Sequence, residues 1–221
     1  MILRSLLIVC STICFAVVSP AQKAPLMTSP AAAASSRIHQ LFLEDQADRS
    51  GGKISDGANV SQRDAARRAE VKELLAAGEV KTAGDFHDAA YIFQHGIEAS
   101  DYLLAHILAV EAVVKGDDSS KWISAATLDR YLQAIGQRQI FGTQYLDRRV
   151  AEFQTHKNDP QAPQPDPNVH GMTQEPFDRT LMPDALRHSF CVPGLEQQAL
   201  NLKEFEAGRY PDGIIPMGCT R

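Results

Sequence analysis

The chain has 221 residues, of which 44% are hydrophobic and 22% are charged, and its formal net charge is −5 at pH 7. This length is sufficient to bury the core of a single domain. The acidic balance and the lack of any basic run argue against nucleic acid or an anionic membrane surface as a partner.

Residues 1–21 have the pattern of a secretory signal peptide. Arg4 precedes the apolar run 6–18, and Ala21 ends a short segment of small residues that a signal peptidase would accept. A retained membrane anchor is the alternative, but the run is shorter than the roughly 20 residues that span a bilayer. We therefore expect cleavage after Ala21, a secreted or periplasmic protein, and no membrane contact after cleavage.

The cysteines fit an oxidising compartment. Cys10 and Cys14 lie in the predicted signal peptide, so Cys191 and Cys219 remain as an even pair. Such a pair predicts a disulfide, with two free thiols as the alternative. The disulfide would tie the C-terminal tail, residues 208–221, to the body of the protein.

Helix-length segments dominate the chain up to residue 136. Residues 22–36 are small and aperiodic and predict a flexible leader, and a single mainly helical domain is expected over 37–207. Each helical segment opens with a residue type that caps helices and is followed by a glycine. The predicted helices after the first one cover 61–77, 82–95, 100–115 and 118–135.

The glycines at positions 78, 96, 116 and 136 recur at intervals of 18 to 20 residues. Two helices with their turns therefore fill about 40 residues, which is the period of helix-pair arrays. The alanine-containing segment 101–136 resembles the tetratricopeptide-like superfamily of helical hairpins. This resemblance implies an array of antiparallel helix pairs, and an ordinary antiparallel helix bundle is the alternative.

The pattern changes after residue 136. Residues 137–145 alternate and predict a strand, with 148–154 and 172–178 as further extended pieces of a small β-hairpin at about 137–178. Gly142 within the first strand predicts a bulge or a close approach by another backbone or a ligand. The proline-rich segment between the last two pieces must form a loop. Two C-terminal helices, 183–190 and 194–207, complete the mainly α fold.

Two polar residues on the predicted helices require an explanation. His106 lies on an apolar stripe, where a histidine is either a hydrogen-bonded core residue or a base. Asp129 faces the apolar side of its helix, and an unpaired buried carboxylate would cost several kcal/mol. We expect His95, His106 or Arg179 to be its partner. An Asp–His pair is also the arrangement that orients a general base.

The histidines do not predict a metal site. His87 and His95 are eight residues apart on one helix, whereas chelating ligands on a helix are three or four residues apart. We therefore predict no metal ion.

A set of short motifs accompanies these residues. Gln94 and His95, Asp129 and Arg130, and the pattern Gly-x-x-Gln-x-x-Gly-Thr-Gln over 136–144 resemble a bacterial family of uncharacterised proteins that often carry signal peptides. The resemblance covers about 41–195. It implies that these residues converge where the helices meet the hairpin, and it implies no activity. The candidate binding residues are Gln94, Arg130, Gln139, Thr143 and Gln144.

Two functions are compatible with this sequence. One is a binding or scaffolding module for a protein or a small polar ligand, which the lack of a known nucleophile or cofactor motif favours; no cofactor is predicted. The other is a small hydrolase or transferase in which His95 or His106 is the base and Asp129 orients it. The enzyme hypothesis requires His95, Asp129 and Gln144 to share one cavity. The sequence does not decide whether the protein is an enzyme.

Overall fold

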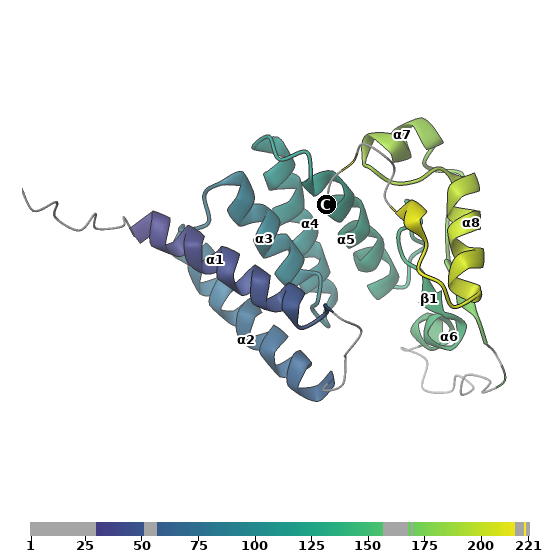
Figure 1. Cartoon of the computed structure of the whole chain (residues 1–221), viewed down its shortest axis with the longest axis horizontal. Helices are drawn as coiled ribbons and strands as arrows, with labels where there is room; N and C mark the ends of the chain where they lie inside the picture. Colours follow the sequence, from purple (N-terminus) through teal and green to yellow (C-terminus); the bar gives the residue numbers. More distant parts are fainter. Residues whose placement is uncertain (1–29, 51–56, 157–167, 169, 215–218, 220–221) are drawn as a thin grey trace, which may run out of the picture.

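The computed structural model describes residues 30–50, 57–156, 168, 170–214 and 219. Over these residues the fold is mainly helical, with a small two-stranded antiparallel hairpin and C-terminal helices, as predicted (Figure 1). The elements in chain order are α1 (Pro30–Ala47), α2 (Gly57–Ala76), α3 (Ala83–Phe93), α4 (Ala99–Val114), α5 (Ser120–Ala134), β1 (Leu146–Asp147), α6 (Arg148–His156), β2 (Met172–Thr173), α7 (Asp184–Ser189), α8 (Leu195–Glu206) and the 3-10 helix η1 (Asp212–Ile214).

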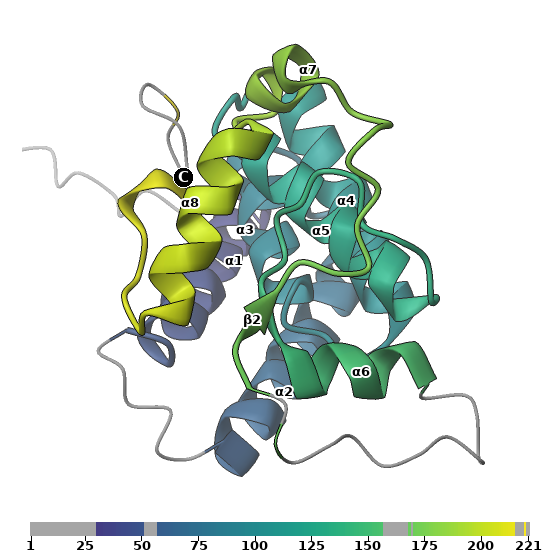
Figure 2. The ribbon, with the colours of Figure 1, turned by 90° about the vertical axis from the view of Figure 1, so that its right-hand side faces the viewer.

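Helices α3, α4 and α5 pack in sequence around an alanine-rich core, and α1 and α2 pack on α3. Small side chains let the helix axes approach closely, and larger apolar side chains fill the remaining space. The fully buried core residues include Ala89, Ala90, Ile92, Phe93, Ala105, Ala109 and Ile123. The hairpin and α6 to α8 lie on the α5 side of these helices (Figures 1 and 2).

The first helix begins earlier than predicted. It starts at Pro30, a residue that favours the first turn of a helix, so residues 30–36 of the predicted leader are helical. Ser35 donates a hydrogen bond to the carboxylate of Asp85, which also forms a capping box with Thr82 at the start of α3. This contact joins the first turns of α1 to the core helices.

The predicted hairpin is present but is built differently. Strand β1 pairs with β2 in antiparallel register, Leu146 opposite Thr173. Residues 137–145 form no regular strand, and the segment 148–154 lies in helix α6 instead of a strand. Asp147 caps that helix, because its Oδ1 accepts a hydrogen bond from the Arg149 N–H at 2.9 Å.

A disulfide joins Cys191 to Cys219, with the two Cα atoms 5.7 Å apart, as predicted. It ties the end of the tail to the loop between α7 and α8. The predicted signal peptide, leader residues 22–29 and most of the proline-rich loop, 157–167, lie outside the described residues. No helix in the described part of the chain has the length and apolar character that crossing a membrane requires.

Candidate functional site

The 139–144 turn, which follows α5, is held by the Asp129 carboxylate. This side chain is fully buried and accepts hydrogen bonds from the backbone N–H groups of Ile140, Phe141 and Thr143 at 2.8 to 3.0 Å. The Thr143 hydroxyl adds a fourth bond at 2.7 Å. Burial raises the pKa of Asp129, and the hydrogen bonds oppose that rise. Three of the donors are N–H groups, so the site is built for the ionised carboxylate.

The opposite side of the same turn is held by Arg187 from α7. Its guanidinium donates to the carbonyl oxygens of Ile140, at 3.1 Å, and Phe141. Arg187 is fully buried, and its Nε lies 3.5 Å from Asp184 Oδ1 in an ion pair. The buried carboxylate of Asp129 and the buried guanidinium of Arg187 therefore hold the N–H groups and the carbonyl groups of one turn.

Glutamines complete the hydrogen bonding of this turn. Gln139 accepts from the Gln144 N–H at 3.0 Å and donates to the Gln144 carbonyl at 3.0 Å. Gln174 donates to the Gly142 carbonyl at 2.6 Å, and Gln198 donates to the Phe141 carbonyl at 2.8 Å. Buried backbone groups need such partners. The glutamines therefore stabilise a turn that has no regular strand pairing.

Gly142 allows the turn to pack this closely. Its φ is +80°, and a Cβ atom there would lie 2.2 Å from Gln198 Oε1 and 2.4 Å from Phe177 Cζ. Other atoms do approach this glycine closely, but they belong to side chains of the C-terminal part of the chain and not to the backbone or ligand that was predicted. The motif residues Asp129, Gln139 and Thr143 thus hold the turn.

The candidate catalytic residues His95, His106 and Asp129 form hydrogen bonds with different partners and not with one another. His95 Nδ1 lies 3.1 Å from Asp45 Oδ1 on α1, and His106 Nδ1 donates to the Ser124 carbonyl at 2.9 Å. The prediction that Asp129 pairs with His95, His106 or Arg179 is wrong. Backbone N–H groups of a turn are its partners, and a sequence pattern does not reveal them.

Asp45 holds His95 within a network of charged residues. Asp45 is fully buried and also accepts from Arg49 at 3.0 Å, while Arg68 donates to the His95 carbonyl at 2.9 Å. Burial lowers the pKa of His95, and the hydrogen bond with Asp45 opposes the shift. His95 therefore links α1 and α2 to the end of α3.

A cleft lies between the end of α3, α5, the hairpin and the C-terminal segment, and we call it the Arg130 cleft. It consists of two cavities that share Arg130, Gln144 and Tyr145. The first cavity, the amide lobe, has a volume of about 280 Å³ and is also lined by Ile97, Tyr102, Gln133, Ala134 and Leu146. The second, the aromatic lobe, has a volume of about 300 Å³ and is also lined by Gln94, Trp122, Ala126, Thr143, Phe205, Tyr210 and Ile214.

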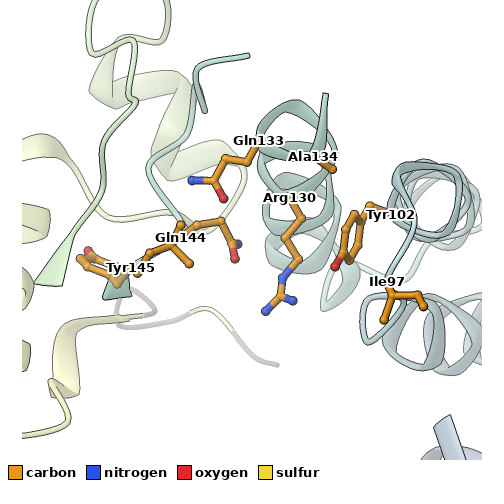
Figure 3. Close-up of a pocket in the computed structure, with 8 residues that line it drawn as sticks. Ile97, Tyr102, Arg130, Gln133, Ala134, Gln144 and Tyr145 are labelled. Atoms are coloured by element: carbon orange, nitrogen blue, oxygen red, sulfur yellow. The ribbon is translucent and has the colours of Figure 1, made fainter. Parts of the chain in front are cut away.

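Arg130 is the charged group of this cleft. Its side chain reaches from α5 between Tyr102 and the pair Gln144 and Tyr145 (Figure 3). Its Nη1 donates to the Gln94 carbonyl at 3.2 Å, and its buried Nε has no hydrogen-bond partner in the described part of the chain. Among the described residues no carboxylate pairs with this guanidinium. Burial lowers the pKa of Arg130, and the charge of Arg49 lowers it further.

The other polar groups in the cleft are neutral amides and phenols. Gln144 Nε2 donates to the Ala126 carbonyl at 3.1 Å, which fixes its amide at the junction of the two lobes. Burial raises the pKa of Tyr145 to about 12, so this phenol remains neutral at physiological pH. The cleft therefore offers one positive charge and several neutral hydrogen-bonding groups.

The structure separates the candidate binding residues into two groups. Gln94, Arg130, Thr143 and Gln144 line the cleft, whereas Gln139 does not. None of His95, His106 and Asp129 lines it either. Within the described residues no group of three His, Cys, Asp or Glu side chains could hold a metal ion.

Several residues that line the cleft or hold the 139–144 turn were not predicted from the sequence. Gln133 lies one helical turn after Arg130, and this spacing places both on one face of α5, so it could have been found. Arg187, Gln174 and Gln198 gave no signal, because their partners are backbone atoms distant in sequence. The chain matches no protein-family model, no curated protein and no solved structure.

Proposed function

We propose that this is a secreted or periplasmic binding protein whose Arg130 cleft holds a small carboxylate ligand. The observation that carries the proposal is the guanidinium of Arg130, which lines both lobes and has no carboxylate partner among the described residues. A partly buried charge without a counter-charge is costly, because the surroundings solvate it poorly. A ligand anion would supply the missing charge.

The chemistry of the cleft favours a singly charged carboxylate. One guanidinium with neutral amides and phenols around it balances a single negative charge, and guanidinium and carboxylate groups match in planar geometry. A dianionic phosphate would leave one charge uncompensated in the cleft. We therefore expect carboxylates to bind more tightly than phosphate.

Binding is supported over catalysis by the positions of the potential bases. His95, His106 and Asp129 are each hydrogen-bonded within the fold and lie outside the cleft lining. The hydrolase or transferase hypothesis needs one of these groups beside the bound ligand. The hydroxyl of Thr143, which does line the cleft, is engaged by Asp129 at 2.7 Å.

The compartment is inferred from the chain itself. A disulfide between Cys191 and Cys219 persists in oxidising compartments, which agrees with the signal-peptide pattern of residues 1–21. A periplasmic or extracellular binding role is consistent with both features.

The test is a titration of the protein with sodium acetate, followed by NMR of side-chain and backbone N–H groups, with sodium chloride at equal ionic strength as the reference. We expect saturable shifts of signals from the cleft residues, and we expect Arg130→Gln to abolish them. Arg138→Gln is the matched control, since Arg138 is exposed and does not line the cleft. Equal acetate shifts in Arg130→Gln and the wild-type protein would refute the proposal.

A further inference from the structure

The Arg130 cleft is larger than a simple carboxylate requires, because it extends on both sides of the guanidinium. We infer that its ligand is an acidic sugar, a hydroxylated ring that carries a carboxylate. This inference rests on the proposed function, since Arg130 would hold the carboxylate. The two lobes would then receive the ring and its hydroxyl groups.

The amide lobe carries the first argument. Gln133 is only 8% exposed, and its buried Nε2 group has no hydrogen-bond partner among the residues that the structure describes, although the side chain lines the cavity. A buried donor without a partner destabilises the protein, so a ligand acceptor at this position would be favoured. Hydroxyl groups both donate and accept, which suits an amide with one donor end and one acceptor end.

Gln144 and Gln94 extend the amide character across the cleft. Gln144 lines both lobes, and Gln94 lines the aromatic lobe. Gln94 is close to Arg130, because the Arg130 guanidinium donates a hydrogen bond to the backbone carbonyl of Gln94. Neutral amides at several points around one guanidinium are suited to a ligand with several hydroxyl groups and one charge. A ligand with a bare hydrocarbon body would leave these amides without partners.

The aromatic lobe carries the second argument. Tyr145 and Phe205 lie with ring centroids 4.9 Å apart, and Tyr210 meets Phe205 edge-on at 5.7 Å. Trp122 on α5 lines the same cavity. The faces of a sugar ring that carry C–H groups are apolar and can pack on aromatic faces, while the hydroxyl groups at the ring edge remain available to amides. The two kinds of lining therefore match the two kinds of surface on one ring.

Other carboxylates fit less well. An aromatic acid could fill the aromatic lobe but would leave the Gln133 Nε2 group without an acceptor. A free amino acid carries an ammonium group, and no carboxylate occurs among the described residues that line the cleft. The acidic sugar satisfies the guanidinium, the amides and the aromatic side chains together.

The experiment compares D-glucuronate, D-glucose, benzoate and acetate in the same NMR titration. Since each hydrogen bond contributes about 1 kcal/mol, or about fivefold in affinity, we expect glucuronate to bind at least about tenfold more tightly than acetate, glucose or benzoate. Gln133→Leu and Tyr210→Ala should each weaken glucuronate binding by about fivefold or more, and by a larger factor than they change acetate binding. Tyr210 is 69% exposed, so its truncation is not expected to unfold the protein.

The results distinguish the two proposals. If acetate binds through Arg130 but glucuronate binds no more tightly than acetate or benzoate, the acidic-sugar inference is wrong and the carboxylate cleft stands. If none of the four compounds shifts the cleft signals, both proposals fail. Leu200→Gln, an exposed change on α8 away from the cleft lining, serves as the control and should alter no affinity.

Discussion

Replacing Asp129 by asparagine tests the role of the buried carboxylate in holding the 139–144 turn. The substitution preserves the size of the side chain but turns one of its two acceptor oxygens into a donor. Oδ2 accepts from both the N–H and the hydroxyl of Thr143, at 2.9 and 2.7 Å. If the amide nitrogen takes that place, the Thr143 N–H loses its acceptor.

The expected loss follows from the hydrogen bonds. A hydrogen bond to a charged group contributes about 1.5 to 3 kcal/mol, and a stranded buried donor adds a similar cost. Burial raises the pKa of Asp129, so removal of its charge returns part of that desolvation cost. We therefore expect a net loss of about 3 kcal/mol, which corresponds to a fall in melting temperature of about 6 to 12 °C for a domain of this size.

Calorimetry and hydrogen exchange together provide the assay. The exchange of the Ile140, Phe141 and Thr143 amides should accelerate more than that of amides in α3 or α4. Asp118→Asn is the control, because the Asp118 side chain is 80% exposed and its pairing with Lys121 contributes at most about 1 kcal/mol. If the Asp129→Asn variant has the same melting temperature as the Asp118→Asn variant, and if its turn amides remain protected from exchange, the carboxylate does not hold the turn.

Three further outcomes follow from the same geometry. In urea unfolding, Gly142→Ala should destabilise the protein by at least about 2 kcal/mol more than Gly136→Ala. Both glycines have positive φ, but of the two only Gly142 has other atoms within 4 Å of the position of an added Cβ. Equal losses of stability in the two variants would contradict the close packing around Gly142. Burial holds the pKa of His95 below its usual value of about 6.5, so the stability that neutral His95 contributes is full above that pH and falls as the pH is lowered below it. Thermal melts from pH 7.5 to about 5 should show this loss of stability, and His95→Gln should reduce the pH dependence over that range. If the variant shows the same pH dependence as the wild-type protein, His95 is not the group responsible. Reduction of the Cys191–Cys219 disulfide removes a cross-link between residues 28 positions apart, and it should lower the free energy of unfolding by about 3 to 4 kcal/mol on the loop-entropy model. The stability of the Cys191→Ser, Cys219→Ser protein should not change on addition of reductant in the same unfolding assay.

Buried charges occur in two different arrangements in this protein. In the first, the opposite charges of Asp129 and Arg187 act on the backbone of one turn, so each is compensated by peptide dipoles and partly by the other. In the second, Arg130 has one carbonyl partner and no described carboxylate. The difference explains why the motif that includes Asp129 and Arg130 combines a structural residue with a candidate ligand-binding residue.

The helical part of the fold follows from local sequence. Thr82 forms a capping box at the start of α3, and a glycine follows the end of each of α3, α4 and α5, so these signals act over one helical turn and can be located without tertiary contacts. Helices α4 and α5 begin without a side-chain cap. Misassignment occurred where local signals were short. Segment 148–154 is expected to be the extended partner of 137–145, although Asp147 in front of it is a helix-capping residue.

The sequence by itself determined the fold class, the helices α3 to α5, the paired cysteines and the group of polar residues at the junction of helices and hairpin. Only the tertiary structure decided what those polar residues do. Asp129 accepts hydrogen bonds from peptide groups, which every sequence possesses. The guanidinium of Arg130, by contrast, pairs with no carboxylate of the described residues. Partners of this kind depend on how distant segments pack in space, and residue spacing along the chain does not encode them.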